Sequence, residues 1–457
     1  MRSTVPLPLR EPPRRSRSEL WKRLVLAIGV AVVLVQWARL GVKPRGDFDL
    51  HWELGRRLVA GEFIYTPGEG GDERGHDYPY PPFWALAHAP LTALRMHPAQ
   101  MLLYPLFVLS LFVLIRALRR LTDDDLPVPR EQVFWIATAA MFLASRYLVR
   151  DMMECGVNLA LVALSYLAVE LWTQRREWLA GSVLGLAISL KCTPALFLAW
   201  FVWKRQWKMA AAGGIMTAVF TLSPIVWMGP AEYGRAMHFW MTHAWDGFGE
   251  ADPSMGVLGE EPLQNNSLRP SLARFLMHLP EGHKGRMDHP LYFDVLDLPP
   301  ATAGIVAKGL MLALLAWVAW RFRARTAPQD GSKVAWECAA VSLLILLFSP
   351  ITWGQHCVGT LPVFYLIART AAVRGGMDRL TLGVLGTYGF AVLVLNRSII
   401  GKDLTWLVDA YHVHTWLFLA LVFVAIRGRS HAETATGAEP VIAGTLEPQE
   451  TPRRRAA

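Results

Sequence analysis

The chain has 457 residues, of which 53% are hydrophobic and 18% charged, and its formal net charge at pH 7 is +9. Soluble domains carry about one quarter charged residues, whereas this chain repeats apolar runs of roughly 18 residues between 24 and 426. The composition therefore excludes an ordinary soluble domain and predicts an all-α polytopic membrane protein. In such a protein a positive charge is typical of cytoplasmic loops, so we expect no nucleic-acid partner.

The two ends of the chain are polar. Segment 1–23 is rich in Pro and Arg, and segment 427–457 is rich in Thr, Pro and Glu and ends in RRR followed by two Ala. We expect both to be disordered and cytoplasmic. The first apolar run has no small-residue cleavage site after it, so we expect it to remain as a membrane span of one integral domain, 24–426.

Eleven apolar segments are candidate spans: 24–41, 101–118, 131–149, 156–173, 178–203, 207–228, 301–320, 334–349, 352–369, 379–397 and 404–426. Basic clusters between them place both termini in the cytoplasm by the positive-inside rule. A single crossing at 178–203 would put KRQWK (204–208) on the wrong face, and KCTP (191–194) interrupts that segment. Because Pro disfavours helix at the preceding residue, we expect two short helices there, for 12 membrane segments.

Two connections are far longer than usual, 42–100 and 229–300. The predicted topology places both on the extracytoplasmic face, and their aromatic content argues against disorder. Within the first, 52–60 and 82–94 are expected to form short helices along the membrane surface. The chain shows no internal repeat, which gives little support to an inverted-repeat transporter.

Two carboxylates, Asp47 and Asp49, follow the first span directly. They would face the same way in an extended segment and diverge in a helix. Helix capping and surface solvation are the plain alternatives, because Asp favours both. For Asp49 the two interpretations are equally supported, whereas Gly46-Asp47-Phe48 at a membrane exit favours a functional site at Asp47.

Lys191 lies in the middle of an apolar segment. A buried ammonium usually lines a cavity or binds a charged ligand, so we expect an anion or phosphate contact, with snorkelling to the interface as the alternative. His356 closes the segment SPITWGQH (349–356), and we expect Trp353 and His356 to lie one turn apart on the helix after Pro350. A packed histidine and a site histidine are equally supported there.

Four charged residues cluster at one external helix end: Arg146, Arg150, Asp151 and Glu154. A surface salt-bridge cluster explains them as well as a binding site does. In the second long loop, QNNSL (264–268) supplies Asn265 and Asn266, whose amides suit sugar hydroxyls, although such runs often form only turns. The same run is formally an Asn-x-Ser glycosylation acceptor, a pattern with many false positives.

Several chemistries find no support. No Walker A, GxGxxG or HExxH motif is present, and no carboxylate, Cys or His spacing is typical of metal ligands. We therefore expect no metal and no cofactor. The groups that share the external face are acidic, basic, amide and aromatic, a combination that suits a sugar and a phosphate.

The chain resembles glycosyltransferase family 87, membrane enzymes of GT-C architecture, from about residue 24 to 426. Five segments in order carry the resemblance: GDFDLHWELGRRLVAGEFIY (46–65), YPYPPF (78–83), LAGSVLGLAISLKCTPALFLAWFVWKRQWK (179–208), NNSL (265–268) and SPITWGQH (349–356). It implies about 10–12 transmembrane helices with two long extracytoplasmic loops. It also implies transfer of a sugar, typically mannose, from a polyprenyl-phosphate donor to a lipid-linked or glycan acceptor, the donor being a substrate rather than a cofactor.

The resemblance assigns roles to individual residues. Asp47 corresponds to the general base of an inverting reaction, with Asp49 as the second choice, while Lys191, His356 and Arg150 are candidates for holding the departing phosphate. Further substrate contacts are expected at Asn158, Asn265, Asn266, Tyr80 and Trp353. Where many members have Gly-Gln-x-Asn, this chain has Cys-Gly-Val-Asn at 155–158, so the Gln is missing and a contact there stays open.

Two alternatives remain. A multispan transporter or flippase of a lipid-linked substrate would place its polar residues near the bilayer midplane on discontinuous helices, and only the break at 191–194 fits that pattern. A GT-C enzyme with another donor sugar, such as arabinofuranose or glucose, is not separated from a mannosyltransferase by the sequence. In each case the expected partners include membrane lipids, and the expected site is extracytoplasmic.

Overall fold

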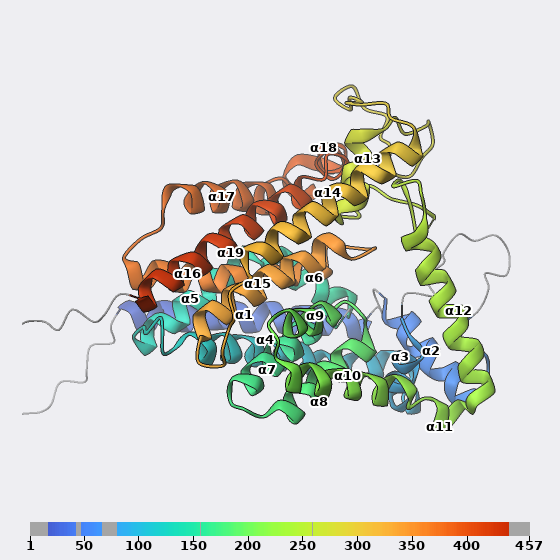
Figure 1. Cartoon of the computed structure of the whole chain (residues 1–457), viewed down its shortest axis with the longest axis horizontal. Helices are drawn as coiled ribbons and strands as arrows, with labels where there is room; N and C mark the ends of the chain where they lie inside the picture. Colours follow the sequence, from blue (N-terminus) through green and yellow to red (C-terminus); the bar gives the residue numbers. More distant parts are fainter. Residues whose placement is uncertain (1–16, 43–46, 66–79, 156, 258, 438–457) are drawn as a thin grey trace, which may run out of the picture.

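The computed structural model describes residues 17–42, 47–65, 80–155, 157–257 and 259–437. Figure 1 shows them as helices packed side by side. The first part of the chain forms α1 (Arg17–Val42), α2 (Phe48–Ala60), α3 (Pro82–His88), the 3-10 helix η1 (Ala89–Ala93), α4 (Met96–Thr122), α5 (Arg130–Leu143), α6 (Ser145–Glu154), α7 (Asn158–Thr173), α8 (Glu177–Leu190), α9 (Ala195–Trp203), α10 (Trp207–Leu222) and α11 (Ile225–Met228).

The second part of the chain begins with α12, which runs along one end of the molecule (Figure 1, right). A small antiparallel hairpin follows it, with Met255 paired to Glu260. The elements of this part are α12 (Pro230–Gly249), β1 (Met255–Gly256), β2 (Gly259–Glu260), α13 (Leu268–Leu276), α14 (Pro300–Arg321), α15 (Gly331–Phe348), the 3-10 helix η2 (His356–Thr360), α16 (Leu361–Arg374), α17 (Arg379–Gly389), the π-helical turn η3 (Phe390–Val394), α18 (Arg397–Ala410) and α19 (Val413–Gly437).

The apolar helices are the basis of the fold class. Among the described residues, seven helices are long and apolar enough to cross a bilayer, or nine if each of two bent pairs crosses as one span. The bent pairs are α5 with α6, at 70°, and α17–η3 with α18, at 104°. Helices α7 and α8 are apolar but shorter. The expected all-α polytopic membrane fold is confirmed, and the chain is a multipass membrane protein.

Helices α8 and α10 pack closely and run in the same direction. A Cβ on Gly181 would lie 2.6 Å from Ala212, so only glycine permits this approach. Two turns further on, the Ser189 hydroxyl lies 3.1 Å from that of Thr221. Because the residue numbers rise together along both helices, α9 between them must return the chain. This confirms that 178–203 is two helices, divided at 191–194, and not a single crossing.

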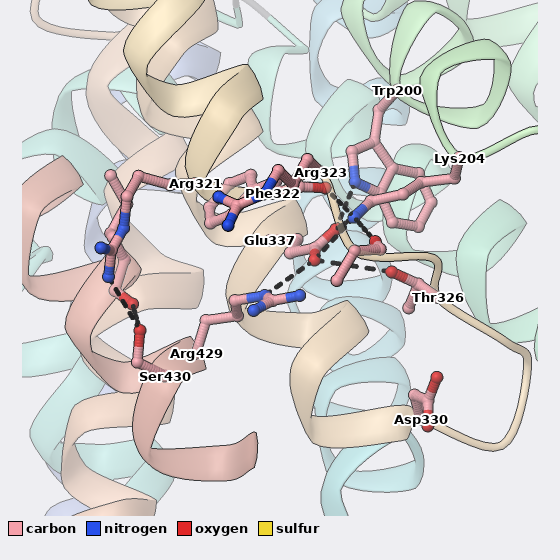
Figure 2. A network of polar contacts seen from close by, with 12 residues as sticks. Trp200, Lys204, Arg321, Phe322, Arg323, Thr326, Asp330, Glu337, Arg429 and Ser430 are labelled. Atoms are coloured by element: carbon pink, nitrogen blue, oxygen red, sulfur yellow. Dashed lines mark hydrogen bonds and ion pairs between the residues drawn. The ribbon is translucent and has the colours of Figure 1, made fainter. Parts of the chain in front are cut away.

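A buried charge network ties several helix ends together (Figure 2). The Glu337 carboxylate, in the second turn of α15, accepts hydrogen bonds from Lys204 Nζ at 2.8 Å and from Arg429 Nε at 3.0 Å. Trp200 Nε1 donates to its other oxygen at 2.8 Å. Lys204 also donates to the carbonyl of Ala324. Helices α9, α15 and α19 and the loop after α14 are therefore joined at one carboxylate.

We expect Glu337→Gln to destabilise the fold by about 1.5–3 kcal/mol, the range for a hydrogen bond to a charged group. The amide keeps the shape of the side chain but leaves Lys204 and Arg429 buried without a counter-charge. Thermal unfolding of the purified protein in detergent measures the effect. Glu131→Gln, on the exposed first turn of α5, is the matched control. Equal melting temperatures for the two variants would contradict this interpretation.

Three predictions about helix boundaries need correction. Disorder at 1–23 and 427–457 is wrong where α1 begins at Arg17 and α19 continues to Gly437. The residues added to both helices include good helix formers, which extend them beyond the apolar runs; 1–16 and 438–457 lie outside the described residues. The span expected at 404–426 is broken, because His412 adopts a left-handed conformation with φ 47° between α18 and α19.

The two long connections are partly helical. The helices expected at 52–60 and 82–94 are present as α2 and as α3 followed by η1. The second connection, 229–300, contains α12, the hairpin and α13. Both connections therefore contribute ordered walls at the end of the bundle where α8 and α15 stop.

Candidate active site

Asp47 is placed at the start of α2 and held from two sides. Its backbone N–H donates to the carbonyl of Glu154 at the end of α6 (3.2 Å). Its carboxylate accepts a hydrogen bond from Gln355 Nε2 (3.3 Å), a residue 308 positions away. Asp49 lies more exposed in the first turn of α2, where its carboxylate accepts the backbone N–H of Leu50. The two residues therefore stand at a helix start and not in an extended segment.

Lys191 leaves the helix at the end of α8 and turns towards three groups. Its ammonium donates to Asn158 Oδ1 at 3.1 Å and lies 3.1 Å from His356 Nε2. It also lies 5.7 Å from the centre of the Tyr80 ring. Burial lowers the pKa of Lys191 to about 8, although the nearby charges of Asp151 and Asp47 raise it. Lys191 is therefore a partly buried cation at neutral pH.

The hydrogen bonds of His356 fix its tautomer. Nδ1 lies 3.0 Å from the carbonyl oxygen of Ile351. The backbone nitrogen of Trp353 also lies 3.2 Å from Nδ1. The Lys191 ammonium only donates, so Nε2 accepts its hydrogen bond, and Nδ1 then carries the proton and donates it to the Ile351 carbonyl. In this tautomer the imidazole is neutral and orients the Lys191 ammonium without repelling it.

Asp151 supports Asn158 from behind. Asn158 Nδ2 donates to Asp151 Oδ1 at 2.8 Å, and the backbone N–H of Leu159 donates to Asp151 Oδ2 at 3.0 Å. The carboxylate thus caps the first turn of α7 and turns the Asn158 oxygen towards Lys191. Although this chain lacks the Gln of the family pattern, its Asn158 still contacts the partly buried cation.

These side chains line one large cavity of about 1330 Å³, bounded by α2, α6, the turn after α8, α12 and the segment after α15. Eight of the predicted site residues line it: Asp47, Asp49, Tyr80, Arg150, Lys191, Asn266, Trp353 and His356. Asn158 lines a small adjoining cavity of about 50 Å³ that Lys191 and His356 also border. The structure thus brings together residues from both ends of the sequence.

Arg150 forms a surface salt bridge, which was the alternative to a role in a binding site. Its guanidinium pairs with the Glu154 carboxylate at 2.6 Å, one turn along α6, and its side chain is 56% exposed. Arg150 therefore borders the cavity from a solvated position, and the surface ion pair and the cavity lining occur together.

Asn265 does not line the cavity. Its Oδ1 accepts the backbone N–H of Thr352 at 2.8 Å, and its Nδ2 donates to the carbonyl of Pro350 at 2.9 Å and to Glu261 Oε2 at 2.6 Å. Both the oxygen and the nitrogen of the Asn265 amide are therefore hydrogen-bonded to other residues of the protein. Asn265 has a positioning role in place of the expected sugar contact. Asn265 fixes the segment that carries Trp353, Gln355 and His356.

The predicted placement of Trp353 on a helix with His356 is wrong. Helix η2 begins only at His356, and Trp353 lies in the turn before it. The backbone N–H of Thr352 is bonded to Asn265, which holds the chain out of a helix at this point. Trp353 still reaches the cavity, and its carbonyl accepts the backbone N–H of His356 at 2.9 Å.

Glu261, which accepts a hydrogen bond from Asn265, makes the stability of the folded protein depend on pH. It is 5% exposed, and burial raises its pKa to about 7 from the ordinary value of 4.5, against opposing effects of Asn265 and Arg269. Between those pH values the folded protein keeps a proton that the unfolded chain releases. Stability therefore falls as pH rises through this window.

We expect Glu261→Gln to lose this part of the pH dependence, because the amide is neutral throughout. Melting temperatures of the purified protein in detergent at about pH 5 and about pH 7.5 test it, within the window that the shifted pKa defines. The wild type should lose more stability than the variant between the two conditions. Identical losses would show that Glu261 does not hold its proton in the folded state.

Several cavity residues were not predicted as site residues. Arg146, Gln355, Trp240, Asp409 and His414 all line the cavity. Gln355 stands inside the SPITWGQH motif, and a charged Asp409 within an expected span was itself a signal of function. Trp240 comes from α12, where the sequence carried no comparable signal. In the described part of the chain, no group of three or more His, Cys, Asp or Glu side chains is placed to hold a metal ion.

One large cavity at the end of a helical bundle is lined by carboxylates, a cation, amides and aromatic rings. This lining is typical of a membrane enzyme that acts on a polar, anionic substrate group. The family described as Glycosyltransferase family 87 matches residues 78–350. The chain belongs to this family and is a membrane glycosyltransferase.

Relatives cover nearly the whole chain. A polyprenol-phosphate-mannose-dependent alpha-(1-2)-phosphatidylinositol mannoside mannosyltransferase of Mycolicibacterium smegmatis is 28% identical over 92% of both chains. Its counterpart of the same description in Mycobacterium tuberculosis is 27% identical over 90% of this chain and 92% of its own. A pentamannoside mannosyltransferase of M. smegmatis is 27% identical over 82% and 84%, respectively. No solved structure matches the chain.

Proposed function

We propose that this protein transfers a mannosyl group from polyprenyl phosphate mannose to a hydroxyl of a glycolipid acceptor of the phosphatidylinositol mannoside class. The names of the relatives support the donor and the acceptor class. The observation that carries the proposal is that the Asp47 carboxylate and the Lys191 ammonium line one and the same cavity. A base and a cation are the two groups that this transfer needs.

The proposed reaction is a single displacement. Asp47 takes the proton of the acceptor hydroxyl, whose oxygen forms a bond to the anomeric carbon as the bond from that carbon to the phosphate oxygen breaks. The electron pair leaves with polyprenyl phosphate, and the anomeric centre inverts. Lys191, oriented by Asn158 and neutral His356, stabilises the charge that develops on the phosphate. Gln355 holds the Asp47 carboxylate in place.

We also propose that the cavity faces the extracytoplasmic side. Arg116 and Arg120, near the C-terminus of α4, pair with Glu170 near the C-terminus of α7. Asn158, at the opposite end of α7, lines the small cavity that adjoins the large one. The arginines and the cavity thus lie at opposite ends of α7, which supports a cytoplasmic location for the end that carries the basic clusters. A topology reporter fused at Gly376 should read cytoplasmic, and an external signal would overturn the orientation.

Transfer by the purified protein in lipid vesicles tests the proposed activity. We expect labelled mannose to move from polyprenyl phosphate mannose to an added phosphatidylinositol mannoside, and polyprenyl phosphates carrying arabinofuranose or glucose to be poor donors. Preferred transfer of another sugar would correct the donor. Movement of the lipid-linked sugar across the vesicle membrane without any transfer would favour a flippase.

A further inference from the structure

A second polar cluster lines the cavity and takes no part in the reaction described above. It consists of Arg146 and Tyr147 of α6, Asp409 of α18 and His414 of α19. The break between α18 and α19 follows Asp409 directly, since α18 ends at Ala410. The first turns of α6 and α19 and the last turn of α18 therefore present these groups to the same cavity as Asp47.

The cluster has unused hydrogen-bonding capacity. His414 is 4% exposed; its Nδ1 lies 2.5 Å from the Tyr147 hydroxyl, and its Nε2 makes no hydrogen bond in the described part of the chain. Arg146 donates through one nitrogen to the carbonyl of Val392, at 3.2 Å. The Asp409 carboxylate, also at the cavity wall, accepts no hydrogen bond from the described residues. A buried polar atom without a partner needs a ligand or water.

The charges of the cluster select the kind of ligand. Arg146 acts electrostatically on both Asp409 and His414, so a cation and a carboxylate share the site. A phosphate would meet the like charge of Asp409, whereas sugar hydroxyls donate to a carboxylate and accept from a guanidinium. Lys191, in the turn after α8 and with Asn158 and His356 as partners, is the better place for the phosphate of the donor.

The size of the cavity leaves room for a second substrate. Pockets for one drug-sized ligand measure about 300–1,000 Å³. This cavity, at about 1330 Å³, exceeds that range. Its volume has room for a donor headgroup beside Lys191 and an acceptor sugar beside Asp409, two lining residues that come from different elements.

We propose that Arg146, Asp409 and His414 form a subsite that binds a sugar ring of the glycolipid acceptor and turns one of its hydroxyls towards Asp47. The proposal rests on the proposed function and specifies which lining residues of the cavity bind which substrate. Asp409 accepts hydrogen bonds from the hydroxyls of the ring, while Arg146 and His414 Nε2 donate to its oxygens.

The test compares Asp409→Asn with Asp403→Asn, an exposed residue of the same helix that does not line the cavity. We expect Asp409→Asn to raise KM for the phosphatidylinositol mannoside at least about tenfold, as for loss of a hydrogen bond to a charged group, with KM for the donor unchanged. Asp403→Asn should change neither. A rise in donor KM, or no change in acceptor KM, would overturn the subsite.

A direct binding measurement tests the subsite independently of the transfer activity. Binding of the same mannoside in detergent micelles, without donor, should weaken to a similar extent in Asp409→Asn, and in His414→Gln if the first variant does not fold. A wild type that binds the mannoside but transfers no sugar would refute the proposed function alone. Equal binding by wild type and variant would refute the subsite even if transfer is observed.

Discussion

Replacement of Asp47 by Asn is expected to lower kcat for mannosyl transfer about 10²–10⁴-fold, the contribution typical of a general base. An amide does not take up the proton of the acceptor hydroxyl. The side chain keeps its size, and its oxygen still accepts the hydrogen bond that Gln355 Nε2 gives the carboxylate. The measurement is single-turnover transfer from labelled polyprenyl phosphate mannose in vesicles, with both substrates saturating.

Asp49→Asn is the matched control for this experiment. Asp49 carries the same group two residues away, lines the same cavity and is more exposed. We expect its transfer rate to stay within about threefold of the wild type, because a surface residue outside the reacting centre contributes little. Undiminished transfer in Asp47→Asn would remove Asp47 as the base. Loss of transfer only in Asp49→Asn would move that role to Asp49.

The sequence predicted those features that depend on local pattern. Apolar runs predicted the all-α membrane fold, although 131–149 is bent and 404–426 is broken. Charge placement combined with Pro194 required a return at 191–194, which the parallel packing of α8 and α10 confirms. The polar residues predicted on one face, among them Asp47, Lys191 and His356, do line one cavity. Isolated polar groups in or beside apolar runs are informative because burying them is costly without a function.

Features that depend on distant pairing could not be predicted. Asn265 carries an amide, a group typical of sugar-binding residues. Its hydrogen-bond partner Thr352 lies 87 residues away, and this pairing gives the amide a positioning role. The same bond keeps Trp353 out of a helix. The placement of Asp409 and His414 at a helix break was not predicted, because hydropathy does not reveal the left-handed His412 that divides the segment. At Asn265 and Trp353, tertiary hydrogen bonds determine the local structure rather than local propensity.

Lys191→Met is expected to lower kcat about 10²–10³-fold, the loss typical of removing one group that stabilises developing negative charge. Met retains much of the length and volume of Lys but carries no charge. Burial lowers the pKa of Lys191 to about 8, so the folded protein holds this charge less readily than the unfolded chain does. The charge therefore opposes folding at neutral pH, and Lys191→Met should not lower the melting temperature. Loss of activity together with stability would indicate a structural role instead.

The pH profile of the same position tests the charge itself. With a pKa of about 8, the Lys191 ammonium deprotonates on the alkaline side, so kcat/KM of the wild type should fall as pH rises above about 8. Lys191→Arg, whose guanidinium stays protonated with a pKa above about 12, should lose this alkaline decline even if its maximal rate is lower. An unchanged decline in Lys191→Arg would assign it to another group. In the proposed mechanism the alkaline limit of activity therefore lies where Lys191 loses its charge in the cavity that it shares with Asp47.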